Sequence, residues 1–321
     1  LSYGVTLAGL IQLFFLFYVT LKYYKPDLVL NLKLSSKVKF FFRKLLPSIL
    51  SSGVTQINIL VGTIIASFQS GAVSYLYYAD RVYQINLAIA GIAVGTVSLP
   101  VLSKAFKTKN LKKISNIQNK SFELSLLLSV PASFGLILAS EEIVNALFGY
   151  GSFSKDDVVL TAEALKYFGF GVPAFALVKI LSNFYFARDN TKTPFYISMF
   201  IVILNILISV SFFSKIGFII IPIATSISTW IGVFIYLYLL NLKKALLLKN
   251  QLIFNFIKIL VSTILMSLVL LLALDSYANY LEYFYKYKAI YLISIVSFVG
   301  ILYLLSCYLL GILKLKNYKT N

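Results

Sequence analysis

Apolar side chains dominate nine stretches of this 321-residue chain, and short polar segments separate them. Each stretch is long enough to cross a bilayer as a helix, which takes about 20 residues. Within lipid, a helix of this kind satisfies all of its own backbone hydrogen bonds. The pattern predicts an all-α polytopic membrane protein with transmembrane helices near residues 2–23, 46–68, 74–103, 122–140, 158–186, 194–213, 217–241, 256–275 and 287–313.

The amino-acid composition further limits the class of protein to which the chain can belong. Hydrophobic residues make up 60% of the chain and charged residues only 12%, which excludes an ordinary soluble domain. The net charge of +18 raises nucleic acid as a partner, but the basic residues form short blocks between apolar runs, so we expect no nucleic-acid binding. There is no histidine, and the single cysteine, Cys307, lies in an apolar run. We therefore expect neither a disulfide nor a transition-metal site.

The basic blocks predict the orientation. When the connections between spans are counted alternately, one set holds 22 of the 29 lysines and arginines and the other holds four. Positive charge is retained in the cytoplasm, so residue 1 is expected outside and Asn321 inside. The chain begins at Leu1 within an apolar run and shows no signal peptide, so we expect that it belongs to a longer protein with preceding helices.

Two charged residues, Asp80 and Arg81, lie within the predicted span 74–103. A charge at the bilayer centre costs at least about 2.5–3.5 kcal/mol, so it usually faces a polar cavity or a partner. Arg81 therefore either faces a polar cavity or a partner, or it extends to water at the membrane surface. The second alternative stays open because Arg81 lies only about 10 Å from the helix end at Ser74. Adjacent helical residues diverge by about 100°, so Asp80 is expected to meet another helix or to cap the external end rather than pair with Arg81.

Three blocks of sequence resemble the MurJ/MviN family of lipid II flippases, within the superfamily of multidrug and polysaccharide exporters. The blocks are Pro47–Leu50 with Gln56-Ile57 and Ile65–Phe68, Tyr77–Arg81 with Gly91–Pro100 and Leu102–Lys104, and Val178-Lys179 with Phe184–Asp189 and Lys192–Pro194.

The resemblance implies a fourteen-helix fold of two six-helix lobes followed by two extra helices. The nine spans would then correspond to helices 6–14. The implied domains are 1–44, the last helix of the first lobe with a basic linker; 45–245, the second lobe; and 246–321, the two extra helices. Localisation is expected in the bacterial inner membrane, with several membrane passes and a cytoplasmic C-terminus.

The implied activity is transport of lipid II, a polyprenyl pyrophosphate that carries a sugar-peptide head group, by alternating access. Arg81 matches the family's cavity arginine, and its guanidinium suits phosphate oxygens. Asp80 is a further substrate-binding candidate. Gln84 stands where the family usually has an acid, which replaces a carboxylate with an amide. Lys179 matches the family but also lies about two turns from the cytoplasmic loop, where it can extend to water.

No nucleotide-binding motif is present, so Na⁺ or the membrane potential is the expected energy source. Oxygens for Na⁺ are available from Asn205 and Ser209 on one predicted helix and from Thr225 and Thr229 on the next, although polar packing between helices is the commoner use of such residues. No other cofactor is expected. The expected partners are lipid II, membrane lipids and the cell-wall synthesis machinery.

Three other functions stay open. The same cation would serve an exporter of another polyprenyl-linked saccharide. An enzyme that acts on these lipid carriers would need clustered acids or a histidine, but the acidic pairs Glu141-Glu142 and Asp156-Asp157 lie in one outer loop. An inactive remnant or scaffold is favoured by Gln84 and by the expected absence of a first lobe.

Overall fold

The computed structural model describes residues 2–313 except for 25–34, 37, 40–52, 54 and 55. The chain divides into two compact units, Leu1–Leu50 and Ser51–Asn321. The first unit contains α1, Ser2–Tyr23. The second contains a short helix, Gln56–Ala66, followed by α3 (Ala72–Leu87), η1 (Ala88–Ala93), α4 (Val94–Lys107), α5 (Leu111–Leu138), α6 (Ser140–Phe148), α7 (Lys155–Phe186), α8 (Lys192–Ile216), η2 (Gly217–Ile219), α9 (Ile220–Leu242), α10 (Asn250–Ser276), α11 (Ala278–Leu281) and α12 (Lys288–Leu309).

The predicted all-α membrane fold is confirmed. Seven segments of the described chain are long and apolar enough to cross a membrane, and one of them, Lys192–Leu242, contains both α8 and α9. These two helices separate at Gly217, whose φ of 75° ends α8, and they then pack against each other. Eight of the nine predicted spans are therefore long helices. The predicted span 46–68 lies partly outside the described residues, and its described part contains Gln56–Ala66.

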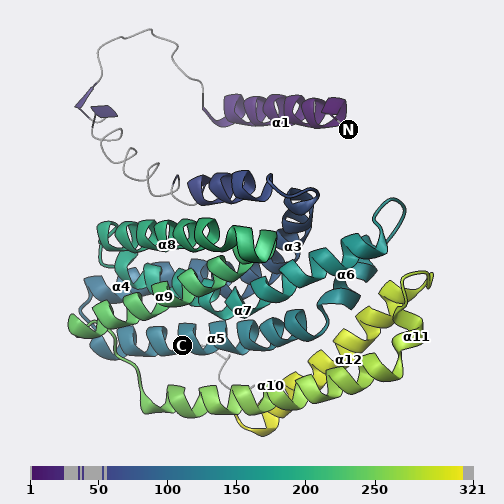
Figure 1. Cartoon of the computed structure of the whole chain (residues 1–321). Helices are drawn as coiled ribbons and strands as arrows, with labels where there is room; N and C mark the ends of the chain where they lie inside the picture. Colours follow the sequence, from purple (N-terminus) through teal and green to yellow (C-terminus); the bar gives the residue numbers. More distant parts are fainter. Residues whose placement is uncertain (1, 25–34, 37, 40–52, 54–55, 314–321) are drawn as a thin grey trace. The chain divides into compact units, whose positions relative to one another are not determined.

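Helix α7 is the centre of the second unit, where it packs against α3, α5 and α9 (Figure 1). Small residues make this close packing feasible, because side chains without bulk let helix backbones approach one another. Gly169, Gly171, Ala174 and Ala176 are all buried on α7. The Ser133 hydroxyl on α5 donates a hydrogen bond to the Gly169 carbonyl at 2.7 Å, which joins the two helices at this level.

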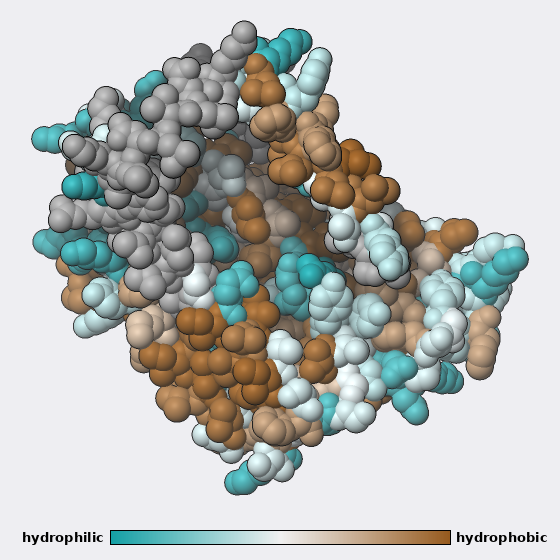
Figure 2. Space-filling model, turned by 90° about the horizontal axis from the view of Figure 1, so that it is seen from above, coloured by the Kyte–Doolittle hydropathy of each residue, from teal (hydrophilic) through white to brown (hydrophobic). Residues whose placement is uncertain are grey.

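The outward faces of α8, α10 and α12 are apolar. Exposed side chains along them include Phe200 and Leu207 on α8, Leu272 on α10 and Ile293 on α12. Figure 2 shows apolar residues in broad patches on one face of the molecule. Large exposed apolar surfaces of this kind mark contact with a membrane or another protein. These faces are therefore suited to lipid.

The helices α10 and α12 pack together and against α5, which places them beside the second unit's central helices. At one end of α12, the Lys288 side chain is almost completely buried. Its ammonium donates hydrogen bonds to Asn145 Oδ1 at 2.8 Å, Gly149 O at 2.7 Å and Tyr283 O at 2.7 Å. It also lies 4.3 Å from the ring centroid of Tyr150. Lys288 therefore fastens α12 to the loop that follows α6.

Replacement of Lys288 by methionine is expected to lower the free energy of unfolding by about 1–3 kcal/mol, because three buried oxygens lose their donor. Thermal unfolding in detergent measures the change. Lys286→Met is the matched control, since Lys286 is exposed and lies two residues away. Equal melting temperatures for the two variants would contradict this role of Lys288.

Candidate functional site

A single long helix carries the candidate site, with a π-helical segment in its middle. Helix α3 continues through η1, Ala88–Ala93, into α4. Such segments are rare and often occur near functional sites. A Cβ on Gly91 would lie 3.0 Å from Ala176 Cα, and one on Gly95 would lie 2.9 Å from Asn183 Nδ2. The Asn183 amide also donates to the Gly95 carbonyl at 2.9 Å. The two glycines therefore let this helix lie directly against α7.

Arg81 lies on the exposed side of α3, while Ala79 and Val82 are buried. Its guanidinium carbon is 4.8 Å from the ring centroid of Tyr77, one turn earlier, a geometry that suits a cation–π interaction. The charge of Arg81 acts on the neighbouring Asp80 carboxylate, but among the described residues the guanidinium makes no hydrogen bond. Its donor groups are therefore open to a ligand.

Asp80 and Gln84 interact with each other on the same helix. The Gln84 amide donates a hydrogen bond to Asp80 Oδ2, and Tyr83 also hydrogen-bonds to this carboxylate. The expectation that Asp80 meets another helix is therefore not met by these contacts, because both partners lie on α3. The substitution of an amide at position 84 has a clear consequence, since an amide can donate to Asp80 and a carboxylate would repel it. Tyr77, Asp80, Arg81 and Gln84 form one polar strip, which we call the α3 strip.

Lys179 is exposed on α7 but lies at a different level from Arg81. Contacts between the helices set the register, because Gly91 lies against Ala176. Lys179 is thus level with a position about twelve residues beyond Arg81, or roughly 15–20 Å along the axis. The two cations do not form one binding site within a single conformation of this unit.

A cavity of about 290 Å³ opens beside the α3 strip. Asp80 and Tyr77 line it from α3, Asn205 from α8 and Thr225 from α9. Asn58, on Gln56–Ala66, also lines the cavity, and its buried Oδ1 has no hydrogen-bond partner in the described part of the chain. The composition of this cavity, one carboxylate with several neutral oxygens, is the donor set that hard cations prefer.

The four residues expected for Na⁺ divide into two groups. Asn205 Nδ2 donates to Thr225 Oγ1 at 2.8 Å, and both residues line the cavity. Ser209 and Thr229 do not line it. The Ser209 hydroxyl instead donates to Asn205 Oδ1 at 3.4 Å, and that of Thr229 donates to the Thr225 carbonyl at 2.6 Å. They act as packing contacts within α8 and α9.

Sequence reasoning missed Tyr77, Tyr83 and Asn58 as members of the site. Tyr77 had a usable signal, because it stands four residues before Arg81 and therefore on the same helix face. Asn58 had none, since only the folded chain brings it beside Asp80 in one cavity.

Comparison with known proteins gives a consistent result. The family model described as "Lipid II flippase MurJ" matches residues 1–292. A probable lipid II flippase MurJ of Rickettsia prowazekii (strain Madrid E) is 36% identical over 304 residues, which cover 94% of this chain and 58% of the relative. A probable lipid II flippase MurJ of Rhizobium meliloti (strain 1021) is 38% identical over 238 residues, which cover 72% of this chain and 43% of the relative. The chain therefore spans about half the length of these relatives.

Solved structures agree. The chain matches the inward closed conformation of lipid II flippase MurJ with a TM-score of 0.69 and 28% identity, over 87% of this chain and 56% of that one. It also matches an outward-facing multidrug transporter of the MATE family with a TM-score of 0.55 over 81% of this chain and 60% of that one, but at 18% identity this likeness shows the fold alone. The chain is a multi-pass membrane protein that belongs to the lipid II flippase MurJ family of transporters.

Proposed function

We propose that this chain takes part in moving lipid II across the bacterial inner membrane. The observation that carries the proposal is the exposed Arg81 in the α3 strip, whose guanidinium makes no hydrogen bond to the described residues. The exposed faces of α8, α10 and α12 are apolar by contrast. A charged strip within a membrane span needs a water-filled cavity or a partner, so the strip faces the transport path rather than lipid.

The mechanism follows from the chemistry of the strip. The pyrophosphate of lipid II carries negative charge that is costly to move through an apolar layer. The Arg81 guanidinium offers paired donors to phosphate oxygens, and the Tyr77 ring restricts its orientation. The contact from Gln84 keeps the Asp80 carboxylate turned from the incoming phosphate. Rocking of the lobes then exposes the bound head group first to one side of the membrane and then to the other.

The choice of substrate rests on the relatives, whose names specify lipid II rather than another polyprenyl-linked saccharide. Growth of a strain depleted of its lipid II flippase tests the proposal, with Arg81 replaced in the protein that carries its complete natural sequence. Loss of growth supports the proposal, and normal growth at ordinary expression removes its physical basis.

The basic connections support a cytoplasmic position for the C-terminus, since positive charge is retained on that side. Lys179 then lies in the cytoplasmic half of the span. There it is suited to attract the anionic head group as it enters from the cytoplasm, before the head group reaches Arg81. In this proposal Lys179 attracts the head group at entry, and Arg81 binds its pyrophosphate.

We propose Na⁺ as the coupling ion, held in the 290 Å³ cavity by Asp80, Asn58, Asn205 and Thr225. Its support is the orphaned Asn58 oxygen beside a carboxylate. The Na⁺ gradient would supply the driving force for transport.

Exchange of K⁺ for Na⁺ at constant ionic strength is expected to raise the melting temperature of the purified protein, because an ion that binds only the folded state stabilises it. Asp80→Asn should abolish this difference, while Ser294→Ala should retain it, since Ser294 is exposed on α12 and lies outside the cavity. A Na⁺ effect that persists in the Asp80 variant would refute this site.

A further inference from the structure

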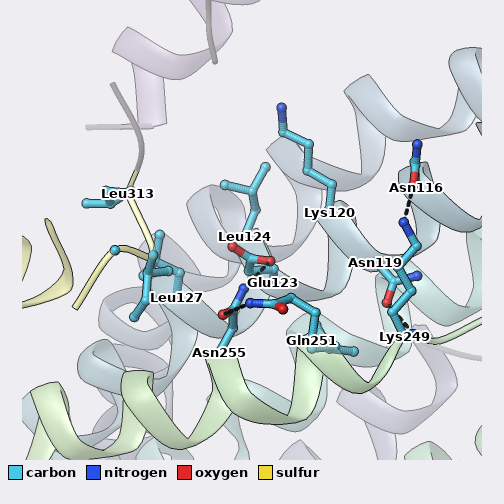
Figure 3. A pocket seen from close by; sticks show the side chains of 13 residues that line it. Asn116, Asn119, Lys120, Glu123, Leu124, Leu127, Lys249, Gln251, Asn255 and Leu313 are labelled. Carbon is cyan, nitrogen blue, oxygen red and sulfur yellow. Dashed lines mark hydrogen bonds between the residues drawn. The ribbon is translucent and has the colours of Figure 1, made fainter. Parts of the chain in front are cut away.

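A second cavity, of about 450 Å³, lies apart from the α3 strip and contains groups of both charges. It is lined by α5, by Lys249 and the start of α10, and by residues 311–313 after α12 (Figure 3). Its polar wall includes Glu123 and Lys249, and its apolar wall includes Leu127 and Leu313. A site at the membrane surface needs a polar wall for a head group and an apolar wall for acyl chains.

Hydrogen bonds hold the segment between α9 and α10 against α5, so this wall of the cavity has a fixed position. Gln118 is fully buried; its amide donates to the Ala245 carbonyl at 3.0 Å and accepts from the Leu247 amide at 3.0 Å. Asn119 acts similarly one residue later, accepting from the Lys249 amide at 2.9 Å and donating to the Leu247 carbonyl at 2.8 Å. These paired contacts fix Lys249 relative to α5.

A half-buried carboxylate occupies one end of the cavity. Glu123 Oε2 accepts from Asn255 Nδ2 at 3.0 Å, and Gln251 Nε2 donates to Asn255 Oδ1 at 3.2 Å (Figure 3). This relay turns the Asn255 amide nitrogen toward Glu123. Lys120, one turn earlier on α5, also lines the cavity, and its side chain is exposed. A half-buried carboxylate that already accepts one hydrogen bond is suited to a cation that can donate another, because charge-assisted hydrogen bonds are the stronger kind.

An ammonium group lies at the other end. Lys249 Nζ donates to Asn116 Oδ1 at 2.6 Å, and the Lys249 side chain is exposed. Asn116 and Glu123 are seven residues apart on α5, which is about 10 Å along the helix. A phosphate and an ammonium joined by an ethylene bridge can fill this interval with a hydrogen bond at each end. The basic residues around the cavity place it at the cytoplasmic surface of the membrane.

We propose that this cavity binds the head group of an aminophospholipid from the cytoplasmic leaflet, with the ammonium at Glu123 and the phosphate at Lys249. The acyl chains then follow Leu127 and Leu313 into the bilayer. A bound lipid of this kind joins α5 to α10 and to the end of α12. The α3 strip takes no part in it, so the lipid site and the proposed transport function can fail independently.

Native mass spectrometry tests the site on the protein with its complete natural sequence, in detergent with added dioleoyl lipids. The unmodified protein is expected to retain phosphatidylethanolamine at least fivefold better than phosphatidylglycerol, which lacks the ammonium, or phosphatidylcholine, whose ammonium has no N–H donor. Glu123→Gln should remove this preference, whereas the matched control Glu282→Gln should keep it, because Glu282 is exposed and distant from the cavity.

A second variant separates the two charges. Lys249→Met is expected to reduce retention of phosphatidylethanolamine and phosphatidylglycerol alike, since both carry the phosphate. Equal retention of all three lipids by the unmodified protein would overturn the proposal.

Discussion

Replacement of Arg81 by alanine is expected to abolish growth of a strain depleted of its lipid II flippase. Hydrogen bonds to charged groups contribute about 1.5–3 kcal/mol each, so the loss of a paired contact corresponds to at least a hundredfold weaker binding of the pyrophosphate. Arg81→Lys should restore growth only in part, because lysine keeps the charge but lacks the planar pair of donors. Colony formation at native expression measures the effect.

Lys166→Ala is the matched control for this prediction. Lys166 is exposed on α7 but lies outside the α3 strip, so its loss should leave growth normal. Immunoblots of the membrane fraction must show equal amounts of both variants. If the two variants supported growth equally, Arg81 would not be the pyrophosphate ligand.

A leucine at Gly91 should have the largest effect on folding. The added Cβ would lie 3.0 Å from Ala176 Cα, which belongs to the backbone of the central helix and cannot turn aside. Overpacking of this kind costs about 3 kcal/mol, and here it would also force α3 away from α7. We expect little folded protein in the membrane, as measured by size-exclusion chromatography of a fluorescent fusion.

Gly300→Leu provides the control, because a Cβ at Gly300 on α12 would have nothing within 4 Å. This variant adds the same side chain to a membrane helix at an open position. It should give a normal elution profile. Similar losses for both variants would mean that leucine in an apolar helix, rather than contact with Ala176, causes the defect.

Much of the fold could be predicted because local patterns determine it. Long apolar runs indicated the spans, and eight of the nine are long helices in the structure. The predicted domain limits at 44/45 and 245/246 stay predictions.

The rest depends on contacts between residues far apart in the sequence. In the sequence, Lys288 resembles the other lysines of the outer connections, and only the fold shows that it is buried beside Asn145. In the same way, only the fold shows that Glu123 accepts a hydrogen bond from Asn255. The π-helix at Ala88–Ala93 has no signal that distinguishes it from an α-helix of the same composition. Arg81 could be named from the sequence, but the cavity beside it could not, because residues of several separate segments line that cavity.

A photo-crosslinking residue at Tyr77 tests the central claim most directly, because that ring lies against the Arg81 guanidinium. A probe there should label lipid II in membranes, and Arg81→Ala should abolish the label. The same probe at Leu272, which is exposed on the apolar face of α10, should label only phospholipid. If the probe at Tyr77 also captured phospholipid alone, the α3 strip would face the bilayer, and Arg81 would not bind the transported diphosphate.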